Sequence, residues 1–531
     1  MTDQPANYLP YHSTGYFSKI VTDYLSYAAP LQGFYLHTPD ISGIKDAVAA
    51  RRAFDTPRQL LVDSLTQQYA GMAAGEKVTA NIQSLAHQHT FTVTTAHQPN
   101  IFTGPLYFIY KVLHVIRLAD ELNEQLPGHH FVPVYYMGSE DADLDELGYL
   151  NIGGRKLVWQ TSQKGAVGRM KVDKALTGLI REIYGQTGVL PYGNELNELF
   201  VRCYTEGKTI QQATLELVNA LFGAYGLVVL VPDNAGLKKA FSPVVKKELT
   251  EGFSHKTVSE TIARLPKEYK VQAGGREINL FYLLNDKRER IERINGKYEV
   301  KTLGLSFTEA EILQELESYP DRFSANVILR GAFQETVLPN VAFVGGGGEL
   351  AYWLELKDVF SGAKIPYPVL MLRNSFLLMT KEQSEKIGKL GFSLTDMFRD
   401  EQFLLNKLVK KETRHQLSLA EEINQAHTFY AQLKKIAEAV DKSLVEHVAS
   451  LETKAVKKIT GLEKKLLRAE KQMFDSEQQQ IAKLKTALFP NNSLQERIDN
   501  FSLYYAREGR AWLQKIYDHS GGFNKGFGVI G

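Results

Sequence analysis

Four consecutive glycines next to charged and aromatic side chains are the most distinctive feature of this 531-residue chain. They are Gly345, Gly346, Gly347 and Gly348, and a helix is predicted to start after them at Glu349. A helix start without Cβ atoms lets backbone amides approach an anionic ligand closely. We expect Arg330 and Gln334, just upstream, to complete this wall of a cofactor site. A flexible surface loop between a strand and a helix is the alternative.

A second group of polar residues follows the β-rich run 91–95, in the turn HQPNIFTGP. Its candidates are His97, Gln98, Asn100, Thr103 and Gly104. Amides at the start of the next helix, with the positive end of its dipole, suit phosphate or carboxylate. His97 and Asn100 could also donate hydrogen bonds to a phosphoryl oxygen in a transition state. The alternative is that the histidine only caps the turn.

A third group is the acidic turn GSEDADLDE after the run 131–137. Glu140, Asp141 and Asp143 could hold Mg²⁺, bind an amino group or orient sugar hydroxyls. Carboxylates are also favoured at a helix start, which accounts for Asp145 and Glu146 without any ligand. We take the first three carboxylates as catalytic candidates and assign no dedicated metal site.

The elements around these turns predict an α/β fold with a parallel sheet. Strand 91–95, helix 106–125 and strand 131–137 form a βαβ unit, and further strands are expected at 226–233, 325–330, 341–344 and 367–372. Ligands of open α/β sheets bind beyond the carboxyl ends of the strands. The sheet would therefore bring the three polar groups together.

From about residue 395 to 488 the composition changes, because glycine and proline almost vanish while Lys, Glu, Gln, Leu and Ala dominate. Apolar residues recur in steps of three and four from Leu444 to Met473, which is a heptad seam with one stutter. Ser443 and Glu446 fit a capping box that would start a new helix. Two antiparallel helices with a tip near 441–450 explain the pattern, and we predict an arm for oligomerisation or docking.

These changes divide the chain into seven expected segments. They are 1–150 for N-terminal helices and the first half of the core, 151–207 for a first insertion, 208–265 for a continuation of the core, 266–322 for a second insertion with a hairpin turning at Asn295 and Gly296, 323–394 for the second half of the core with the glycine run, 395–490 for the coiled-coil arm, and 491–531 for a tail that packs on the core.

Composition and missing motifs exclude several classes of protein. The net charge of +2, from 62 basic and 60 acidic residues, gives no reason to expect a nucleic-acid partner. The single cysteine, Cys203, excludes a disulfide framework and is expected to be a small, semi-buried hydrophobe. The absence of a GxxxxGK[ST] loop and of GxGxxG after a strand argues against P-loop and dinucleotide enzymes. Without a signal peptide or an apolar spanning run, we expect a cytoplasmic protein with no membrane partner.

Several of these segments together resemble a bacterial family, the proposed cysteine-adding enzymes of bacillithiol biosynthesis. The resemblance is carried by TGPLYFIYK (103–111), the SED turn (139–141), GLVVLVPD (226–233), INLFYL (278–283) and ERIDNFSLYYAREG (496–509). It is clearest in FSANVILR…QETVLPNVAFVGGGGELAYWLELK. The matching segments run through nearly the whole chain in the same order as in the family.

The resemblance implies a Rossmann-like core related to the nucleotidyltransferase superfamily of class I aminoacyl-tRNA synthetases. Connecting-peptide insertions and an antiparallel coiled coil that forms a homodimer would accompany this core. The implied reaction joins the carboxyl group of L-cysteine to the amino group of glucosaminyl-malate, giving bacillithiol. Since amide formation from a free carboxylate is uphill in water, ATP is the expected cofactor, with ADP or AMP as product and Mg²⁺ as a candidate companion.

The resemblance also suggests roles for the polar groups. His97, Asn100 and Thr103 would bind phosphoryl or carboxylate oxygens, and the acidic turn would hold the amine or the sugar hydroxyls. The chain departs from the family pattern in three places: HQPN (97–100) keeps only the first histidine of the HxGH-type signature, Ala142 replaces a histidine, and Gly347 replaces a frequent proline. Two alternatives therefore stay open, a non-catalytic synthetase-like scaffold and a ligase for a different amino-sugar acceptor.

Overall fold

The computed structural model of the chain describes residues 7–413, 415–523 and 526–531. The chain divides into two units, the first from residues 5–377 with 494–530 and the second mainly from residues 378–493. Among the described helices, none combines the length and hydrophobicity that spanning a bilayer requires.

A five-stranded parallel sheet organises the first unit. Its strands are β2 (Thr90–His97), β3 (His130–Met137), β6 (Val228–Leu230), β13 (Asn340–Gly345) and β14 (Val369–Leu372). Their spatial order is β14-β13-β2-β3-β6, with every neighbouring pair parallel. The chain order reverses between β2 and β13, which makes the crevice beyond their carboxyl ends the expected ligand site. The predicted Rossmann-like α/β class is confirmed.

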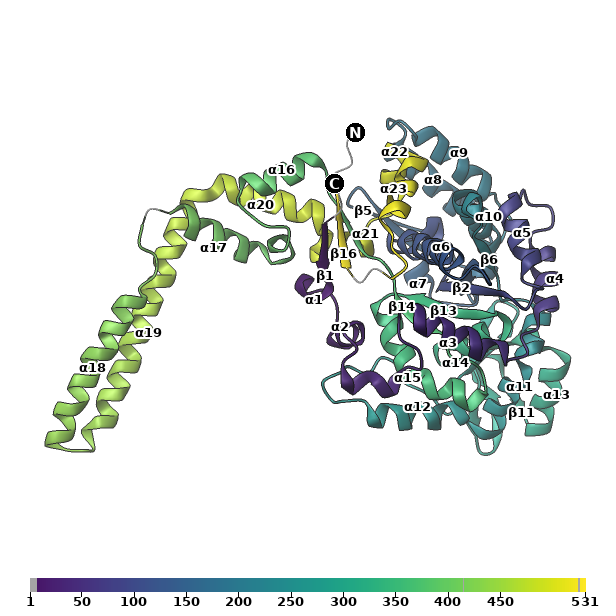
Figure 1. The fold of residues 1–531 in the computed structure, drawn as a ribbon, viewed down its shortest axis with the longest axis horizontal. Helices are drawn as coiled ribbons and strands as arrows, with labels where there is room; N and C mark the ends of the chain where they lie inside the picture. The colour runs from purple at the N-terminus through teal and green to yellow at the C-terminus, as the bar shows by residue number, and fades with distance from the viewer. Residues whose placement is uncertain (1–6, 414, 524–525) are drawn as a thin grey trace. The chain divides into compact units, whose positions relative to one another are not determined.

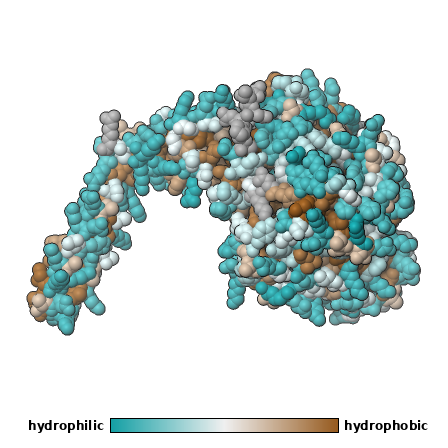
Figure 2. Space-filling view, viewed as in Figure 1, coloured by the Kyte–Doolittle hydropathy of each residue, from teal (hydrophilic) through white to brown (hydrophobic). Residues whose placement is uncertain are grey.

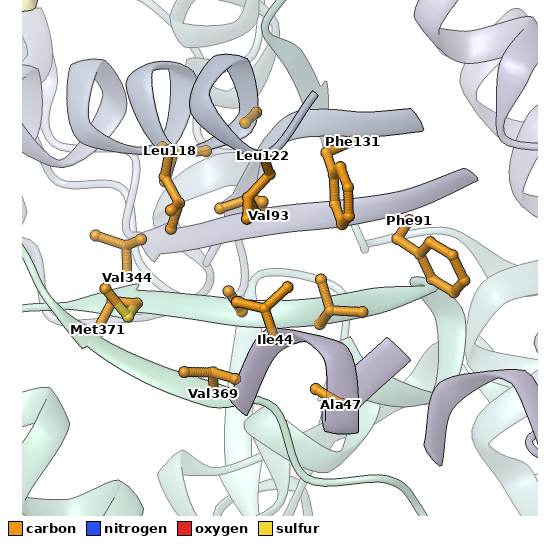
Figure 3. Packing of buried hydrophobic residues seen from close by; sticks show 14 of the residues in the cluster. Ile44, Ala47, Phe91, Val93, Leu118, Leu122, Phe131, Val344, Val369 and Met371 are labelled. Atoms are coloured by element: carbon orange, nitrogen blue, oxygen red, sulfur yellow. The ribbon is translucent and has the colours of Figure 1, made fainter. Parts of the chain in front are cut away.

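Two helices cover one face of this sheet, α3 (Ile41–Arg52) and α6 (Tyr107–Gln125). Figure 3 shows Ile44 of α3 and Leu118 and Leu122 of α6 packed against strand residues that include Val93 and Val344. Because alternate strand residues point to the same face, one buried cluster can span β2, β3, β13 and β14. Each buried Leu or Ile side chain contributes roughly 1.5–3 kcal/mol to folding.

The opposite face carries α14 (Val327–Val337) and α15 (Gly347–Ala363), where Trp353 stacks on Phe343 with ring centroids 4.3 Å apart. The strand predicted at 325–330 is wrong. A short strand, β12 (Phe323–Ala325), ends just before Asn326, whose side chain accepts a hydrogen bond from the Ile328 amide and caps α14. Apolar residues dominate this helix, so the sequence of its first turn has the same pattern as a buried strand.

Two hydrogen bonds of one buried histidine, His114, predict that the stability of the protein depends on pH. His114 on α6 is fully buried; its Nε2 donates to the Gly522 carbonyl and its Nδ1 accepts from the Asn374 amide, 3.0 and 3.1 Å away. The bond accepted at Nδ1 requires the neutral ring, because that nitrogen can accept only while it carries no proton. Burial lowers the pKa of His114 to about 4, while the Gly522 contact opposes the shift.

We expect the free energy of unfolding to fall as pH decreases from about 6.5 towards 4, because the unfolded state then binds a proton that the folded state rejects. The His114 contribution amounts to about 3 kcal/mol over this range. Urea unfolding at successive pH values should show a shallower dependence for His114→Gln than for the native chain. The exposed-site variant His12→Gln should follow the native curve; equal curves for all three proteins would refute the assignment.

The second insertion contains the predicted hairpin. Strands β9 (Glu292–Ile294) and β10 (Lys297–Val300) pair antiparallel across Asn295 and Gly296, which have φ of 50° and 78°. Two positive φ angles are the signature of the turn that Asn-Gly favours. A second hairpin of this insertion, β7 (Leu280–Leu284) and β8 (Lys287–Arg290), pairs with β12.

The first unit contains, in whole or in part, further helices and strands outside the five-stranded sheet. The helices are α1 (Tyr11–Thr14), α2 (Lys19–Leu25), α4 (Arg58–Gln68), α5 (Glu76–Ser84), α7 (Leu144–Leu147), α8 (Lys174–Thr187), α9 (Gly193–Cys203), α10 (Ile210–Phe222), α11 (Ala235–Glu251), α12 (Phe253–Arg264), α13 (Glu309–Ser318), α21 (Gln495–Ile498), α22 (Ser502–Glu508) and α23 (Arg510–His519). The strands are β1 (Asn7–Pro10), β4 (Tyr149–Ile152), β5 (Arg155–Val158), β11 (Leu305–Phe307), β15 (Phe376–Leu378) and β16 (Gly526–Ile530). Strands β1 and β16 pair antiparallel. Cys203 is buried, and burial raises its pKa to about 11, as expected of a small hydrophobe.

The second unit is helical, and its helices are α16 (Lys381–Lys389), α17 (Glu401–Glu412), α18 (Ala420–Val440), α19 (Leu444–Lys471) and α20 (Asp475–Leu488). Figure 1 shows α18 and α19 side by side, and only residues 441–443 connect them, so the predicted antiparallel pair is confirmed. The capping box does not form: Ser443 precedes α19, but its side chain makes no cap bond. Instead the Asp441 carboxylate accepts from the Ser443 amide.

Candidate active site

A cavity of about 640 Å³ opens at the carboxyl ends of β2, β3 and β13. Nine of the predicted site residues lie in its wall: His97, Gln98, Glu140, Asp141, Arg330, Gly346, Gly347, Gly348 and Glu349. They come from the end of β2 and the turn after it, from the turn after β3, from α14, and from the start of α15, all far apart in the sequence. The cavity coincides with the point where the strand order reverses, as the rule for open sheets predicts.

Six other predicted residues do not line the cavity: Asn100, Thr103, Gly104, Asp143, Gln334 and Gly345. The Asp143 carboxylate caps α7 by accepting from the Glu146 amide, 3.2 Å away. The Gln334 side chain is fully buried, and its Oε1 accepts from Arg330. These positions allow the six residues to support the cavity rather than contact what it holds.

His97 ends β2 with its ring held between Tyr107 and Phe108 of α6. The side chain is 8% exposed, and its Nε2 has no hydrogen-bond partner among the described residues. Burial lowers the pKa of His97 well below its ordinary value, and the cations Lys111 and Arg373 add to this effect. The imidazole is therefore neutral at physiological pH, with one nitrogen available to a ligand.

The glycine run places a helix start in the wall. Gly346 is the N-cap of α15, and the Glu349 carboxylate accepts from the Gly346 amide at 2.8 Å. Glu349 also forms an ion pair with Lys111, whose Nζ donates to the Ala96 carbonyl at 3.0 Å. Burial lowers the pKa of Lys111, although Glu349 opposes the shift. The ion pair thus connects the glycine run to the end of β2.

Arg330 projects into the wall from α14 with only neutral partners. Its guanidinium donates to Gln334 Oε1 and to the Tyr352 hydroxyl, each 3.2 Å away. It also lies 5.7 Å from the ring centroid of Tyr136, close enough for a cation–π contact. Among the described residues Arg330 forms no ion pair. A largely buried cation without a carboxylate partner favours an anionic ligand.

The two carboxylates of the SED turn differ in their surroundings. Glu140 forms an ion pair with buried Lys238 and accepts from the Ser324 hydroxyl at 3.0 Å. Asp141 forms no ion pair among the described residues; its Oδ2 accepts from Gln98 at 3.3 Å. Asp141 is therefore the carboxylate that remains available to a cationic group.

Glu146, whose place in the sequence is explained by a helix start alone, also lies in the wall. Burial raises its pKa, and the neighbouring charges of Asp141 and Asp143 raise it further. A carboxylate with a raised pKa in a cavity is a candidate for proton transfer.

Several wall residues were missed, notably Lys111, Arg373, Arg497 and the arginines Arg276, Arg288 and Arg290 of the second insertion. A lysine inside the apolar run YFIYKVLHVI was a usable signal for the first of them. Arg373 directly follows β14, so the rule that singled out His97 applies to it as well. Nothing local in the sequence predicts that the insertion reaches the sheet.

The residues of the cavity fit one of the two expected ligands, ATP, and not the other, Mg²⁺. The Nε2 of His97, the guanidinium of Arg330 and the glycine backbone suit the phosphates of ATP. For Mg²⁺ the fit is absent: the described ranges contain no group of three His, Cys, Asp or Glu side chains that could hold a metal ion.

Comparison with known proteins agrees with this architecture. Residues 5–374 match the family described as bacillithiol biosynthesis BshC, N-terminal Rossmann-like domain, and residues 376–531 match its C-terminal coiled-coil domain. A protein of Flavobacterium johnsoniae named "Putative cysteine ligase BshC" is 40% identical, with 98% of this chain and 99% of the relative covered.

Proteins of the same name from Flavobacterium psychrophilum and Christiangramia forsetii are 40% and 37% identical. The alignments cover 97% of this chain and of the first relative, and 99% of this chain and of the second. Together, the two family models and these nearly full-length matches establish that the chain belongs to the BshC family of bacillithiol biosynthesis.

Proposed function

We propose that this protein is an ATP-dependent amide ligase that joins the carboxyl group of L-cysteine to the amino group of glucosaminyl-malate. The name of its relatives supports cysteine as one substrate. The observation that carries the proposal is a single cavity with two groups of opposite charge: Lys111, Arg330 and Arg373 among its cations, Asp141 and Glu146 among its anions.

The cationic group suits an activated carboxylate. When bound, ATP supplies the phosphoryl or adenylyl group that converts a carboxylate oxygen into a leaving group. Arg330 and the α15 amides would hold its phosphate oxygens, and the neutral His97 would donate or accept at Nε2 according to tautomer. Preorganised donors of this kind stabilise the negative charge that develops as the leaving group departs.

The anionic group suits the amine. Asp141 would hold the ammonium group of the acceptor and orient it towards the cysteine carbonyl carbon. Before it attacks, the ammonium group must lose one proton to free its lone pair, and Glu146 is a suitable acceptor because burial raises its pKa. The nitrogen loses a second proton to solvent as the carbon–nitrogen bond forms and the bond between the carbonyl carbon and the leaving group breaks. The charge of the leaving group is then neutralised at the cationic group while the proton stays on the carboxylate.

Arginines of the second insertion suit the malate part of the acceptor. Arg276, Arg288 and Arg290 line the cavity. Arg288 is held in place by hydrogen bonds to Ser324 Oγ and the Ala325 carbonyl, 3.1 and 3.2 Å away, and by stacking over Phe281. Planar guanidinium groups bind carboxylates in a bidentate manner, so this cluster would favour a dicarboxylate acceptor over a neutral amino sugar.

Asp141→Asn is expected to lower ligase turnover by about 10²-fold, because the amide keeps the shape but cannot compensate the ammonium charge. Turnover at saturating cysteine and ATP, with the acceptor varied, measures this effect. Asp145→Asn is the matched control, since Asp145 lies on α7 in the same acidic turn but outside the wall. Full turnover in the Asp141 variant would remove this carboxylate from the mechanism.

The direct test is a mass-spectrometric assay of the purified protein with L-cysteine, glucosaminyl-malate, ATP and Mg²⁺. Bacillithiol with stoichiometric AMP would establish an adenylating ligase, and ADP would establish an acyl-phosphate route. Another amino sugar that reacts faster would redefine the acceptor. Untouched ATP and no product under any of these conditions would refute the proposal and favour the scaffold alternative.

A further inference from the structure

The turn that follows His97 has a strained backbone. Phe102, Thr103 and Gly104 have φ of 49°, 70° and 64°, so three consecutive residues, two of them not glycine, have positive φ. This conformation is uncommon for an aromatic residue and especially for β-branched threonine. Strain of this kind persists only where surrounding contacts impose it, and it concentrates at functional sites.

Asn500, from the C-terminal segment, supplies two of those contacts. Its side chain is 1% exposed, and its Nδ2 donates to the carbonyls of Phe102 and Gly104, at 2.9 and 2.6 Å. Its Oδ1 accepts from the amide and the hydroxyl of Ser502, at 3.0 and 2.5 Å. Both ends of the amide are thus engaged, which fixes its orientation against the turn.

Tyr204 holds the turn from another direction. Its hydroxyl accepts from the Phe102 amide at 2.8 Å, and the two rings pack with centroids 4.5 Å apart. The Leu106 amide in turn donates to the Asp499 carbonyl at 2.8 Å. Two segments distant in sequence from the turn therefore hold both of its ends.

The clamped segment carries polar atoms that the rest of the protein leaves unsatisfied. His97 Nε2, Asn100 Oδ1 and Thr103 Oγ1 are all buried without a hydrogen-bond partner in the described part of the chain. A buried polar atom without a partner costs roughly 1–3 kcal/mol, so three in one segment indicate a segment shaped for a purpose other than stability.

We propose that Tyr204 and Asn500 are positioning residues that hold the strained turn after β2 so that His97 stays buried and faces the cavity. The proposal rests on the proposed function for its purpose, because the turn is part of the same site. Its geometric content can be tested without turnover. When the clamp is weakened, the turn relaxes to an ordinary conformation and the His97 ring becomes accessible to water.

Tyr204→Phe against Tyr69→Phe is a matched test. The Tyr69 hydroxyl also accepts a backbone amide at 2.8 Å, that of Val229, from a buried ring far from the turn. Each variant loses one hydroxyl and leaves one amide without its acceptor. We therefore expect similar losses of thermal stability, while only Tyr204→Phe changes the turn.

Two readouts decide the proposal in the full-length protein. Amide hydrogen exchange in residues 99–106 should accelerate at least about tenfold in Tyr204→Phe and stay unchanged in Tyr69→Phe. The ring signals of His97, recorded by NMR against pH, should titrate closer to the ordinary histidine pKa only in Tyr204→Phe. Equal behaviour of the two variants in both readouts would overturn the proposal. Ser502→Ala, which removes a donor to Asn500, replaces Tyr204→Phe should that variant not fold.

Turnover adds a third readout. If the native protein is an active ligase, Tyr204→Phe should lower kcat more than it raises KM for ATP, and unchanged kcat would reduce the clamp to a structural role. If the native protein makes no product, the proposed function fails, yet the exchange and NMR readouts still decide whether the clamp exists.

Discussion

Arg330→Met should lower ligase turnover by about 10³-fold, the largest effect that we expect from a single substitution. Arg330 is one of the cations of the cavity wall that form no ion pair in the described ranges, and its hydrogen-bond partners are neutral, so its charge is available to a phosphate or carboxylate. Loss of a preorganised donor aimed at developing charge costs about 3–4 kcal/mol in the transition state. Steady-state kinetics and calorimetric titration with ATP measure the two parts of the effect, turnover and affinity.

The free energy of unfolding of Arg330→Met should stay unchanged or rise, in contrast to the loss of turnover. A largely buried charge that forms no ion pair is costly to desolvate, so we expect methionine of similar length to be tolerated, although the attraction of Arg330 to Glu349 and Glu335 is lost. The turnover of Arg330→Lys should lie between those of the native protein and Arg330→Met, because lysine keeps the charge but not the planar guanidinium group. Arg322→Met is the control: Arg322 pairs with Glu315 at 2.6 Å outside the wall, and its loss should leave turnover unchanged. Native turnover in Arg330→Met would exclude this anion site.

The sheet could be predicted from the sequence because its strands are short apolar runs bounded by turn residues. The runs at 91–95, 131–137 and 341–344 are all strands in the structure. The prediction was wrong at 325–330, where a helix with apolar residues on most of its circumference begins after Asn326. Periodicity distinguishes a buried helix from a buried strand only over a longer window than its first turn provides.

The site could be predicted as far as it consists of strand ends. His97, Asp141 and the glycine run share one cavity because the carboxyl ends of parallel strands meet at one edge. Lys111 comes from the second turn of α6 and Arg288 from an inserted hairpin. Their approach to the cavity depends on tertiary packing, which spacing along the chain does not encode.

The coiled-coil arm, α18 and α19, exposes apolar side chains that predict the oligomeric state of the protein. In α18, Phe429, Ile436 and Val440 are 55%, 62% and 77% exposed and, at steps of seven and four residues, form one stripe. In α19, Leu444, Leu451 and Leu462 form another stripe and are 40–51% exposed. Figure 2 shows hydrophobic surface gathered at the tip of the hairpin. No residue of either helix is buried, so the seam is only partly covered within one chain.

We therefore expect the native protein to be a homodimer in which two hairpins bury these stripes against each other. Ile436→Glu combined with Val440→Glu should yield a monomer at micromolar concentration, because two carboxylates would have to be desolvated in the seam. Light scattering coupled to size-exclusion chromatography measures the mass. Ala431→Glu is the control, since position 431 is exposed on the opposite side of α18 from the stripe.

Assays of the same monomeric double variant distinguish the ligase hypothesis from the scaffold hypothesis. Every residue of the cavity wall belongs to residues 5–377 or 494–530, and none belongs to the helical unit that contains the arm. If the protein is a ligase, the monomeric double variant should keep turnover within about twofold of native, because the electrostatic groups that stabilise the transition state are intact. If the protein is a scaffold, bacillithiol production in cells should fail in the monomer and persist in Arg330→Met. A ligase predicts activity in the monomeric double variant and loss of activity in Arg330→Met, whereas a scaffold predicts the reverse.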